Sequence, residues 1–437
     1  MKADNSIAQL RHFFVSQPMR NIQKITNGFH LIAGYLLAAA LILPFRFQYH
    51  LLWIFFISYG IDFFASGRLL YWQWTRDKWW GVVMLLLWAL QPLWHLFEHS
   101  HLPYFNQVMD HRLAFMAFGV MTILGFSKHF KMKHLAWVLC SSAALAVLYI
   151  IIKIGCYTFI TDPERTYHFM VERITLFGSH MNFNLYLNTA LVSAIYIANN
   201  SSRQALWWLL LPVTIIATAL AITEGRVGMI TGGTLCLIGI FVWFRAMNLE
   251  KMGRIVGGIC LLIGCCYGLH HIAWVNSHFK GSDIDDNPRK YIWHVAIETG
   301  KEHPLLGQGV SDARKNFVEH GTNDTDFIEH YAQKNIFENE NWNGDLYVMH
   351  PHNASIAFWL EYGVIGVALF LLLFLLAPVG IDNNNKLTTI LLLGVFLLQA
   401  TFEIFGSNLT PLSWGFFVTL FRNADTTPCK KTEEKTT

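Results

Sequence analysis

Long apolar runs repeat along this chain and constrain its fold more than any other feature. The 437 residues are 54% hydrophobic and only 14% charged. A run of roughly 20 apolar residues is long enough to cross a lipid bilayer as a helix. This composition is too apolar for a water-soluble globule, and it indicates contact with membrane lipids and no nucleic-acid partner. We therefore expect an all-α polytopic membrane protein.

The hydrophobic pattern predicts about 12 membrane-spanning helices. They cover approximately residues 28–45, 50–67, 79–97, 112–127, 135–155, 180–198, 205–222, 227–247, 255–275, 352–377, 387–404 and 410–422. The fourth and the last of these segments are short. The first lacks a small-residue cleavage site, so we interpret it as a span and not as a signal peptide.

The distribution of Lys and Arg predicts how the spans are threaded. Short cytoplasmic loops carry an excess of these two residue types. If the N-terminus is cytoplasmic, 19 of the 32 Lys and Arg residues fall in cytoplasmic segments, and the short external loops contain few. Both termini are therefore predicted to be cytoplasmic.

The same pattern divides the chain into four regions. Residues 1–275 hold the first nine predicted spans and residues 351–422 the last three. Between them, residues 276–350 form an external loop with 13 Asp and Glu against seven Lys and Arg. A structureless connection of this length is uncommon, so we expect a small helical lid. Residues 423–437 are predicted to be a disordered cytoplasmic tail.

The external loop contains its own helix signals. Asp286-Asn287-Pro288 favours a helix start, and Arg289, Trp293 and Ile297 follow at helical spacing. The run His303-Pro-Leu-Leu-Gly-Gln-Gly309 then contains the Pro and Gly residues that end a helix.

A second motif lies where the chain re-enters the membrane. It reads His350-Pro-His352-Asn353, then nine residues, then Gly363-Val-Ile-Gly366. An imidazole can accept a proton near neutral pH without special tuning, so His352 is a candidate general base. Asn353 is predicted to cap the tenth span. The two glycines are predicted to flatten one helix face for close packing.

Two arginines are candidate anion-binding residues on the outer side. Arg226 lies in Thr-Glu-Gly-Arg-Val-Gly, where a charge is costly unless it is paired or faces a cavity. Arg289 begins the loop helix. The guanidinium fork fits phosphate oxygens bidentately. The alternative for each is an ordinary ion pair, Arg226 with Glu224 and Arg289 with Asp285 or Asp286. Among the other external cations, Arg112, Arg165 and Arg173 could also line the route to an anion, but they rank lower.

These motifs together resemble the O-antigen ligase and polymerase superfamily of bacterial envelope enzymes. The resemblance rests on His352-Asn353 with Gly363 and Gly366, on Gly225-Arg226-Val-Gly, and on Arg289, Trp293 and Pro304-Leu-Leu-Gly. It implies an inner-membrane glycosyltransferase with a GT-C-like fold and a periplasmic loop before the tenth span. The implied donor is an undecaprenyl-diphosphate-linked glycan, and for the ligases the implied acceptor is lipid A–core. Transfer would invert the anomeric carbon without a metal.

The resemblance also implies residue roles. His352 would act as the base, and Arg226 and Arg289 would bind the donor diphosphate. Asn353, Glu403, His350, Gly363 and Gly366 would support the site. No cofactor is implied. The spacing His350-x-His352 is not a helical metal-binding pattern, and no Cys or close carboxylate pair accompanies it.

Several alternatives stay open at this stage. Within the superfamily, the chain could be an O-antigen polymerase or a protein O-oligosaccharyltransferase. A polysaccharide or lipid transporter or flippase is the rival outside it. The two halves of the chain show no internal repeat, which argues against a transporter. The sequence fixes neither the glycan nor the oligomeric state.

Overall fold

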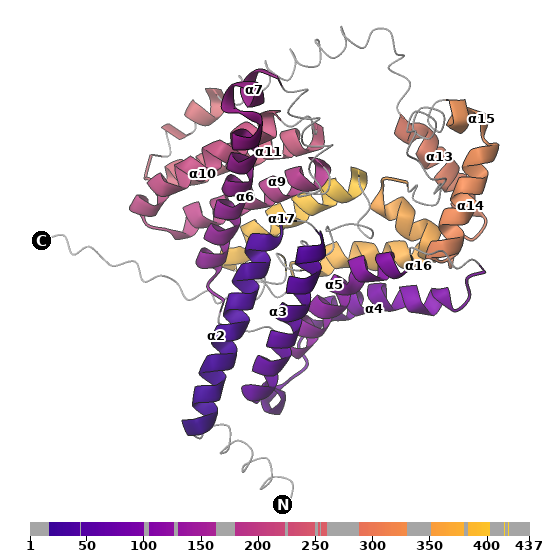
Figure 1. Ribbon diagram of the computed structural model, residues 1–437, viewed down its shortest axis with the longest axis horizontal. Coiled ribbons are helices and arrows are strands. Elements are labelled where there is room, and N and C mark those ends of the chain that lie inside the picture. Colours follow the sequence, from indigo (N-terminus) through magenta and orange to yellow (C-terminus); the bar gives the residue numbers. More distant parts are fainter. Residues whose placement is uncertain are drawn as a thin grey trace, which may run out of the picture.

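The computed structural model is helical, and it describes most but not all of the chain. Its described residues are 17–43, 45–99, 105–125, 130–162, 180–222, 226–249, 252–253, 255–259, 288–329, 351–379, 383–402, 415 and 418. Within these residues there are helices and no strands (Figure 1). The all-helical class predicted from the sequence is confirmed for this part of the chain.

The N-terminal half contributes eight labelled helices. They are α2 (Gln17–Ala40), α3 (Phe45–Ala65), the short 3₁₀ helix η1 (Arg68–Tyr71), α4 (Lys78–His95), α5 (Phe105–Leu124), α6 (Met132–Ile154), α7 (Cys156–Thr161) and α9 (His180–Asn200). The C-terminal half contributes seven more. They are α10 (Arg203–Ile222), α11 (Arg226–Ala246), α13 (Pro288–Lys301), α14 (Val310–Asn323), α15 (Thr325–Phe327), α16 (Ala354–Leu376) and α17 (Asn383–Phe402).

The predicted spans largely coincide with these helices. Ten of the twelve overlap a described helix, while 255–275 and 410–422 lie mostly outside the described residues. By length and apolarity, four described helical segments qualify as membrane spans: Met132–Ile154, Arg203–Ala221, Val227–Ala246 and Ala354–Leu376. The structure thus supports a helical membrane protein. The count of twelve and the GT-C-like arrangement stay predictions.

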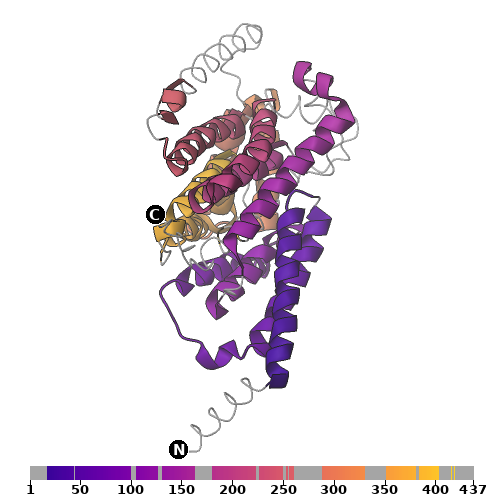
Figure 2. The same cartoon turned by 90° about the vertical axis from the view of Figure 1, so that its left-hand side faces the viewer.

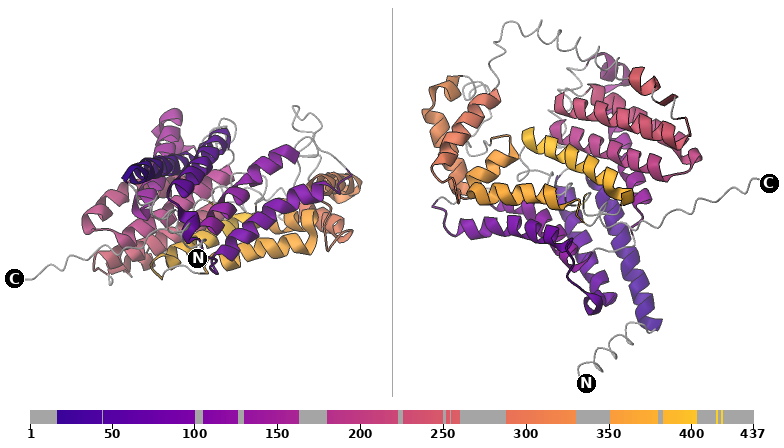
Figure 3. Two further views of the ribbon diagram at one scale, coloured as in Figure 1. Left: turned by 90° about the horizontal axis from the view of Figure 1, so that it is seen from below. Right: turned by 180° about the vertical axis from the view of Figure 1, so that it is seen from behind.

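The helices gather into two groups. In one, α4 packs against α5 and α16; in the other, α9 packs against α6, α10, α11 and α17 (Figures 2 and 3). Helices α16 and α17 contact each other and join the groups. The close approach of α4 and α5 depends on small residues, because a Cβ on Gly81 would lie 2.7 Å from the carbonyl oxygen of Gly119.

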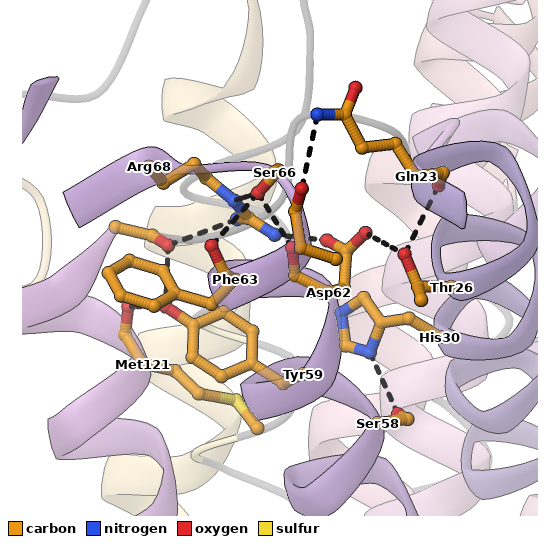
Figure 4. A network of polar contacts seen from close by, with 12 residues as sticks. Gln23, Thr26, His30, Ser58, Tyr59, Asp62, Phe63, Ser66, Arg68 and Met121 are labelled. Carbon is orange, nitrogen blue, oxygen red and sulfur yellow. Dashed lines mark hydrogen bonds and ion pairs between the residues drawn. The ribbon is translucent and has the colours of Figure 1, made fainter. Parts of the chain in front are cut away.

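Polar contacts tie the α2–α3 hairpin to its neighbour α5 (Figure 4). Asp62 is buried and forms an ion pair with Arg68. Tyr59 donates a hydrogen bond of 2.7 Å to the carbonyl oxygen of Gly125, at the end of α5. Between the two helices of the hairpin, buried His30 of α2 contacts the Ser58 hydroxyl of α3 at 3.0 Å. Each of these side chains has at least one polar partner nearby, as is usual for buried polar groups.

Within the region 276–350, which the sequence predicts to be external, the described residues 288–329 contain helices of their own. α13 begins at Pro288 and ends at Lys301, before the Pro- and Gly-containing run. α13, α14 and α15 share a small apolar core that includes Ile292, Phe317 and Leu360, the last from α16. Figure 1 shows this unit beside the beginning of α16. Residues 288–329 are therefore helical, while the bounds of the predicted region 276–350 and its side of the membrane stay predictions.

Candidate functional site

Helix α16 is broken at Gly363. This residue has φ 60° and ψ −153°, values that do not occur within an α-helix. Residues 354–362 therefore form a short first segment, and residues 364–376 continue as a second. The prediction that Gly363 flattens the face of a continuous helix is corrected here, because the glycine instead permits a break that a residue with a side chain would resist.

The run that follows α13 fills this break. Val364 donates its backbone N–H to the carbonyl oxygen of Pro304 at 3.0 Å, and Gln308 donates to that of Leu360 at 3.0 Å. Gly309 donates to the carbonyl oxygen of Glu361 at 2.8 Å. A helix interruption leaves backbone groups without their usual partners, and the loop supplies these partners. Two motifs separated by more than fifty residues in sequence thus form one structure.

The loop and the helix approach so closely that side chains are excluded. Gly307 and Gly363 both have positive φ, and a Cβ on either one would overlap backbone atoms of the opposite segment. A Cβ on Gly366 would lie 2.6 Å from the Phe358 carbonyl oxygen, so this glycine lets the two segments of α16 approach each other closely. Its predicted role in packing against a neighbouring helix stays a prediction. Trp94, from the end of α4, donates its indole N–H to the Leu306 carbonyl oxygen at 2.7 Å and holds the loop from the other side.

At the start of α16, Asn353 provides the predicted cap. Its side-chain oxygen accepts a hydrogen bond from the Ile356 N–H at 3.1 Å. Its amide nitrogen donates to the Thr401 carbonyl oxygen at 3.2 Å, which attaches the helix start to α17. The preceding residue, His352, has φ 46°. A left-handed backbone is uncommon for residues other than glycine, and such residues cluster at functional sites.

Helix α13 packs against the residues that precede α16. The Trp293 indole N–H donates to the Pro351 carbonyl oxygen at 2.8 Å. Arg289 lies four residues earlier on α13, hence on the same helix side, and its side chain is half-buried. Arg289 and His352 therefore come from two elements that are in direct contact.

Arg226 is the first residue of α11. Its side chain lies outside the described part of the structure. The glycine two residues later allows α11 to pack closely on α9, because a Cβ on Gly228 would lie 2.6 Å from the Asn184 side chain of α9. Asn188 also donates to the Gly228 carbonyl oxygen at 3.1 Å. The start of α11 is therefore fixed tightly on α9, which in turn contacts α17.

The remaining predicted positions are only partly described. His350 and Glu403 lie outside the described residues, as do Glu224, Arg165 and Arg173. Among the described residues, no three His, Cys, Asp or Glu side chains are grouped closely enough to hold a metal ion.

Sequence reasoning missed the partner of Arg112. Its guanidinium is buried and donates to Glu361 Oε2 at 2.5 Å and to the Tyr362 hydroxyl at 2.7 Å. The available signal was that α5 and α16 each carry a charge of opposite sign within an apolar run, and such charges normally pair. Arg112 is thus committed to an internal ion pair and leaves the set of diphosphate-binding candidates.

Glu98, near the end of α4, was also missed. Its buried carboxylate accepts a hydrogen bond from the Ser311 N–H at 2.9 Å, in the first turn of α14, and contacts the His95 ring at 2.6 Å. A carboxylate is favourable at a helix N-terminus. On α13, the hydrogen bond from Lys301 lowers the pKa of the exposed Glu298 carboxyl.

Comparison with known proteins agrees with the motifs. Residues 211–371, from α10 to the second segment of α16, match the model of a family described as O-antigen ligase. A protein of Rickettsia conorii whose assigned name is that of a polysaccharide ligase is 30% identical over 100 residues, which is 22% of this chain. That match spans 21% of the relative's own length. The resemblance predicted from the motifs is confirmed at the level of the superfamily.

Proposed function

We propose, from the match to the O-antigen ligase family, that this chain is a membrane glycosyltransferase of the ligase type. It transfers a glycan from undecaprenyl diphosphate to a sugar hydroxyl of lipid A–core. The reaction takes place at the periplasmic face of the bacterial inner membrane. The observation that carries the proposal is the assembly of separate motifs around His352. Asn353 and Trp293 fix the start of α16, and the 304–309 loop fixes the end of its first segment.

His352 acts as the general base in this proposal. It accepts the proton of the acceptor hydroxyl while the hydroxyl oxygen forms a bond to the anomeric carbon. The bond between that carbon and the diphosphate oxygen breaks, and its electron pair leaves with the carrier diphosphate. Attack from the face opposite the leaving group inverts the anomeric configuration. A base held by strained backbone next to three anchoring contacts is suited to this positioning.

Arg289 and Arg226 bind the diphosphate and stabilise the charge that develops on it. The leaving group needs cationic donors, and arginine supplies parallel N–H groups that match phosphate oxygens. Arg289 comes from a helix that contacts the His352 segment through Trp293. Arg226 opens α11, whose first N–H groups also favour an anion. In this scheme the two arginines provide the charge stabilisation that a divalent metal supplies in other transferases.

Two further functions in the superfamily use the same donor. A polymerase would pass the glycan to another carrier-linked repeat, and a protein O-oligosaccharyltransferase would pass it to a protein hydroxyl. The name of the Rickettsia relative favours a ligase. A transporter is the alternative of another class, and it would require polar residues near the bilayer midplane and not at one membrane face.

Deleting the gene and examining the lipopolysaccharide tests the proposal. Loss of all O-antigen from the core, with polymer still attached to the carrier, is the expected result for a ligase. Core that carries a single repeat would indicate a polymerase. Glycan trapped on the cytoplasmic side would indicate a flippase. Plasmid-borne wild-type protein should restore the polymer, and the His352→Ala protein at equal abundance should not.

A further inference from the structure

The ion pair between Arg112 and Glu361 is buried and lies next to the break in α16. Both side chains are nearly inaccessible, with exposures of 1% and 5%. Arg112 also donates to the Tyr362 hydroxyl at 2.7 Å, and its guanidinium lies 5.1 Å from the centroid of the Phe358 ring. All three partners belong to the first segment of α16, residues 354–362, which ends at the Gly363 break.

The candidate base, His352, lies two residues before the opposite end of this segment. Asn353 and Trp293 anchor that end to α17 and α13, respectively. At the break, the 304–309 loop supplies backbone hydrogen bonds, and Arg112 supplies the charged contact from α5. Because the break interrupts the helix, the second segment of α16 cannot by itself fix the direction of the first. External contacts must do so.

Stability alone does not account for a buried ion pair here. Desolvation of two charges can exceed their attraction, and well-packed apolar residues often replace such a pair at no loss of stability. What an apolar pair lacks is the directional fork that holds the Glu361 carboxylate and the Tyr362 hydroxyl at once. The arrangement selects one orientation of the segment.

We propose that Arg112 is a positioning residue for glycosyl transfer. Through Glu361 and Tyr362 it fixes the orientation of residues 354–362 and thereby places His352 against its substrates. The kinetic test of this inference rests on the proposed function. A second test, by hydrogen exchange, does not depend on that function. Neither Arg112 nor Glu361 touches substrate, and neither takes part in proton transfer.

The main experiment replaces the pair by apolar residues. Arg112→Met and Glu361→Leu are made singly and together, and transfer rate, thermal stability and backbone hydrogen exchange are measured on the purified full chain. Each single variant leaves one buried charge unpaired and should lose stability. The double variant should regain wild-type stability, yet its kcat should stay lower on the order of 10²-fold, because a misplaced base slows the reaction while donor KM changes little.

Hydrogen exchange gives the readout that does not depend on activity. In the double variant, residues 354–362 should exchange faster, while residues 364–376 stay protected as in the wild type. If the double variant recovered its kcat and its exchange protection together with its stability, the pair would be merely structural. That result would overturn the proposal. Absence of transfer in the wild-type chain, with the exchange difference present, would refute the proposed function and leave the positioning role standing.

A milder variant keeps the test decisive if the double variant does not fold. Tyr362→Phe removes one hydroxyl, and with it the 2.7 Å hydrogen bond from Arg112. Loss of a hydrogen bond to a charged group should lower kcat by about 10-fold. Tyr59→Phe is the matched control, since Tyr59 is equally buried and its hydroxyl donates to Gly125 in another part of the molecule. Equal kcat in both variants would reject the proposal.

Discussion

His352 combines a strained backbone with firmly anchored neighbours. Its φ of 46° is uncommon for a residue with a side chain, and such strain persists only where surrounding contacts enforce it. Those contacts are visible on both sides, from Trp293 to the Pro351 carbonyl oxygen and from Asn353 to Ile356 and Thr401. A residue held in this way suits a reaction that requires a base at a fixed position.

Removal of the imidazole is therefore predicted to abolish most of the transfer rate. His352→Ala should reduce kcat by about 10²–10⁴-fold, the usual contribution of a positioned base. His350→Ala, two residues away, should reduce it much less. Transfer of glycan from a purified carrier-linked donor, followed by electrophoresis of the product, measures both. Activity should also survive a strong chelator; turnover lost to chelation and restored by metal would contradict the metal-free scheme.

The two candidate arginines are predicted to act through their forked geometry and not through charge alone. Arg226→Lys and Arg289→Lys keep the charge but lose bidentate binding, so each should reduce transfer severely, by roughly 10-fold or more. Lys290→Ala is the matched control, because Lys290 neighbours Arg289 on α13 but is exposed. Normal activity of both Lys variants at equal protein abundance would show that positive potential is sufficient.

At the scale of elements, the contact between the 304–309 loop and the α16 break is the central feature. Gly363→Ala adds a Cβ where the Leu305 backbone lies and requires a positive φ that alanine resists. It should destabilise the folded protein by about 1–3 kcal/mol and lower activity with it. Gly394→Ala in α17 is the control, since its Cβ would meet open space. Thermal unfolding of the two purified variants would decide; equal melting temperatures would contradict this role for Gly363.

The sequence predicted individual elements better than their partners. Apolar runs and helix signals located most helices, including the start of α13 at Pro288 and the cap at Asn353. They did not predict that α5 begins at Phe105, ahead of the apolar run. They also did not predict that the charge of Arg112 is neutralised by Glu361, a residue 249 positions away. Local sequence patterns do not predict contacts between residues so far apart in the chain.

The break in α16 escaped prediction for the same reason. Glycine within an apolar run is compatible with a continuous helix, with close packing or with an interruption. What selects the interruption is the backbone of Pro304, Gln308 and Gly309, which offers hydrogen bonds that a continuous helix would not need. The candidate residues His352 and Arg289 were recognised from motifs, whereas the contacts that place them depend on the fold.

At the scale of the whole molecule, the α13–α15 unit is connected to the long apolar helices by several contacts. α13 and α14 contact α16, and α14 also contacts α4, where Glu98 accepts a hydrogen bond from Ser311. His99 adds a second link through its backbone N–H to Asp312 at 2.8 Å. The unit of α13–α15 is therefore attached at several points to α4 and α16.

The predicted threading of the chain through the membrane can be tested directly. Excess Lys and Arg in the short loops predicts cytoplasmic termini and a periplasmic segment 276–350. Asn323 ends α14 and is exposed, so Asn323→Cys should react with a membrane-impermeant thiol reagent added to intact cells whose outer membrane has been made permeable. Thr432→Cys should react only after the inner membrane is opened, because the charged tail that contains it should be cytoplasmic. Both variants need a background in which the seven native cysteines are replaced. The reverse labelling pattern would place α13, Arg289 and the start of α16 on the cytoplasmic side, away from a periplasmic acceptor, and would exclude transfer to lipid A–core at that site.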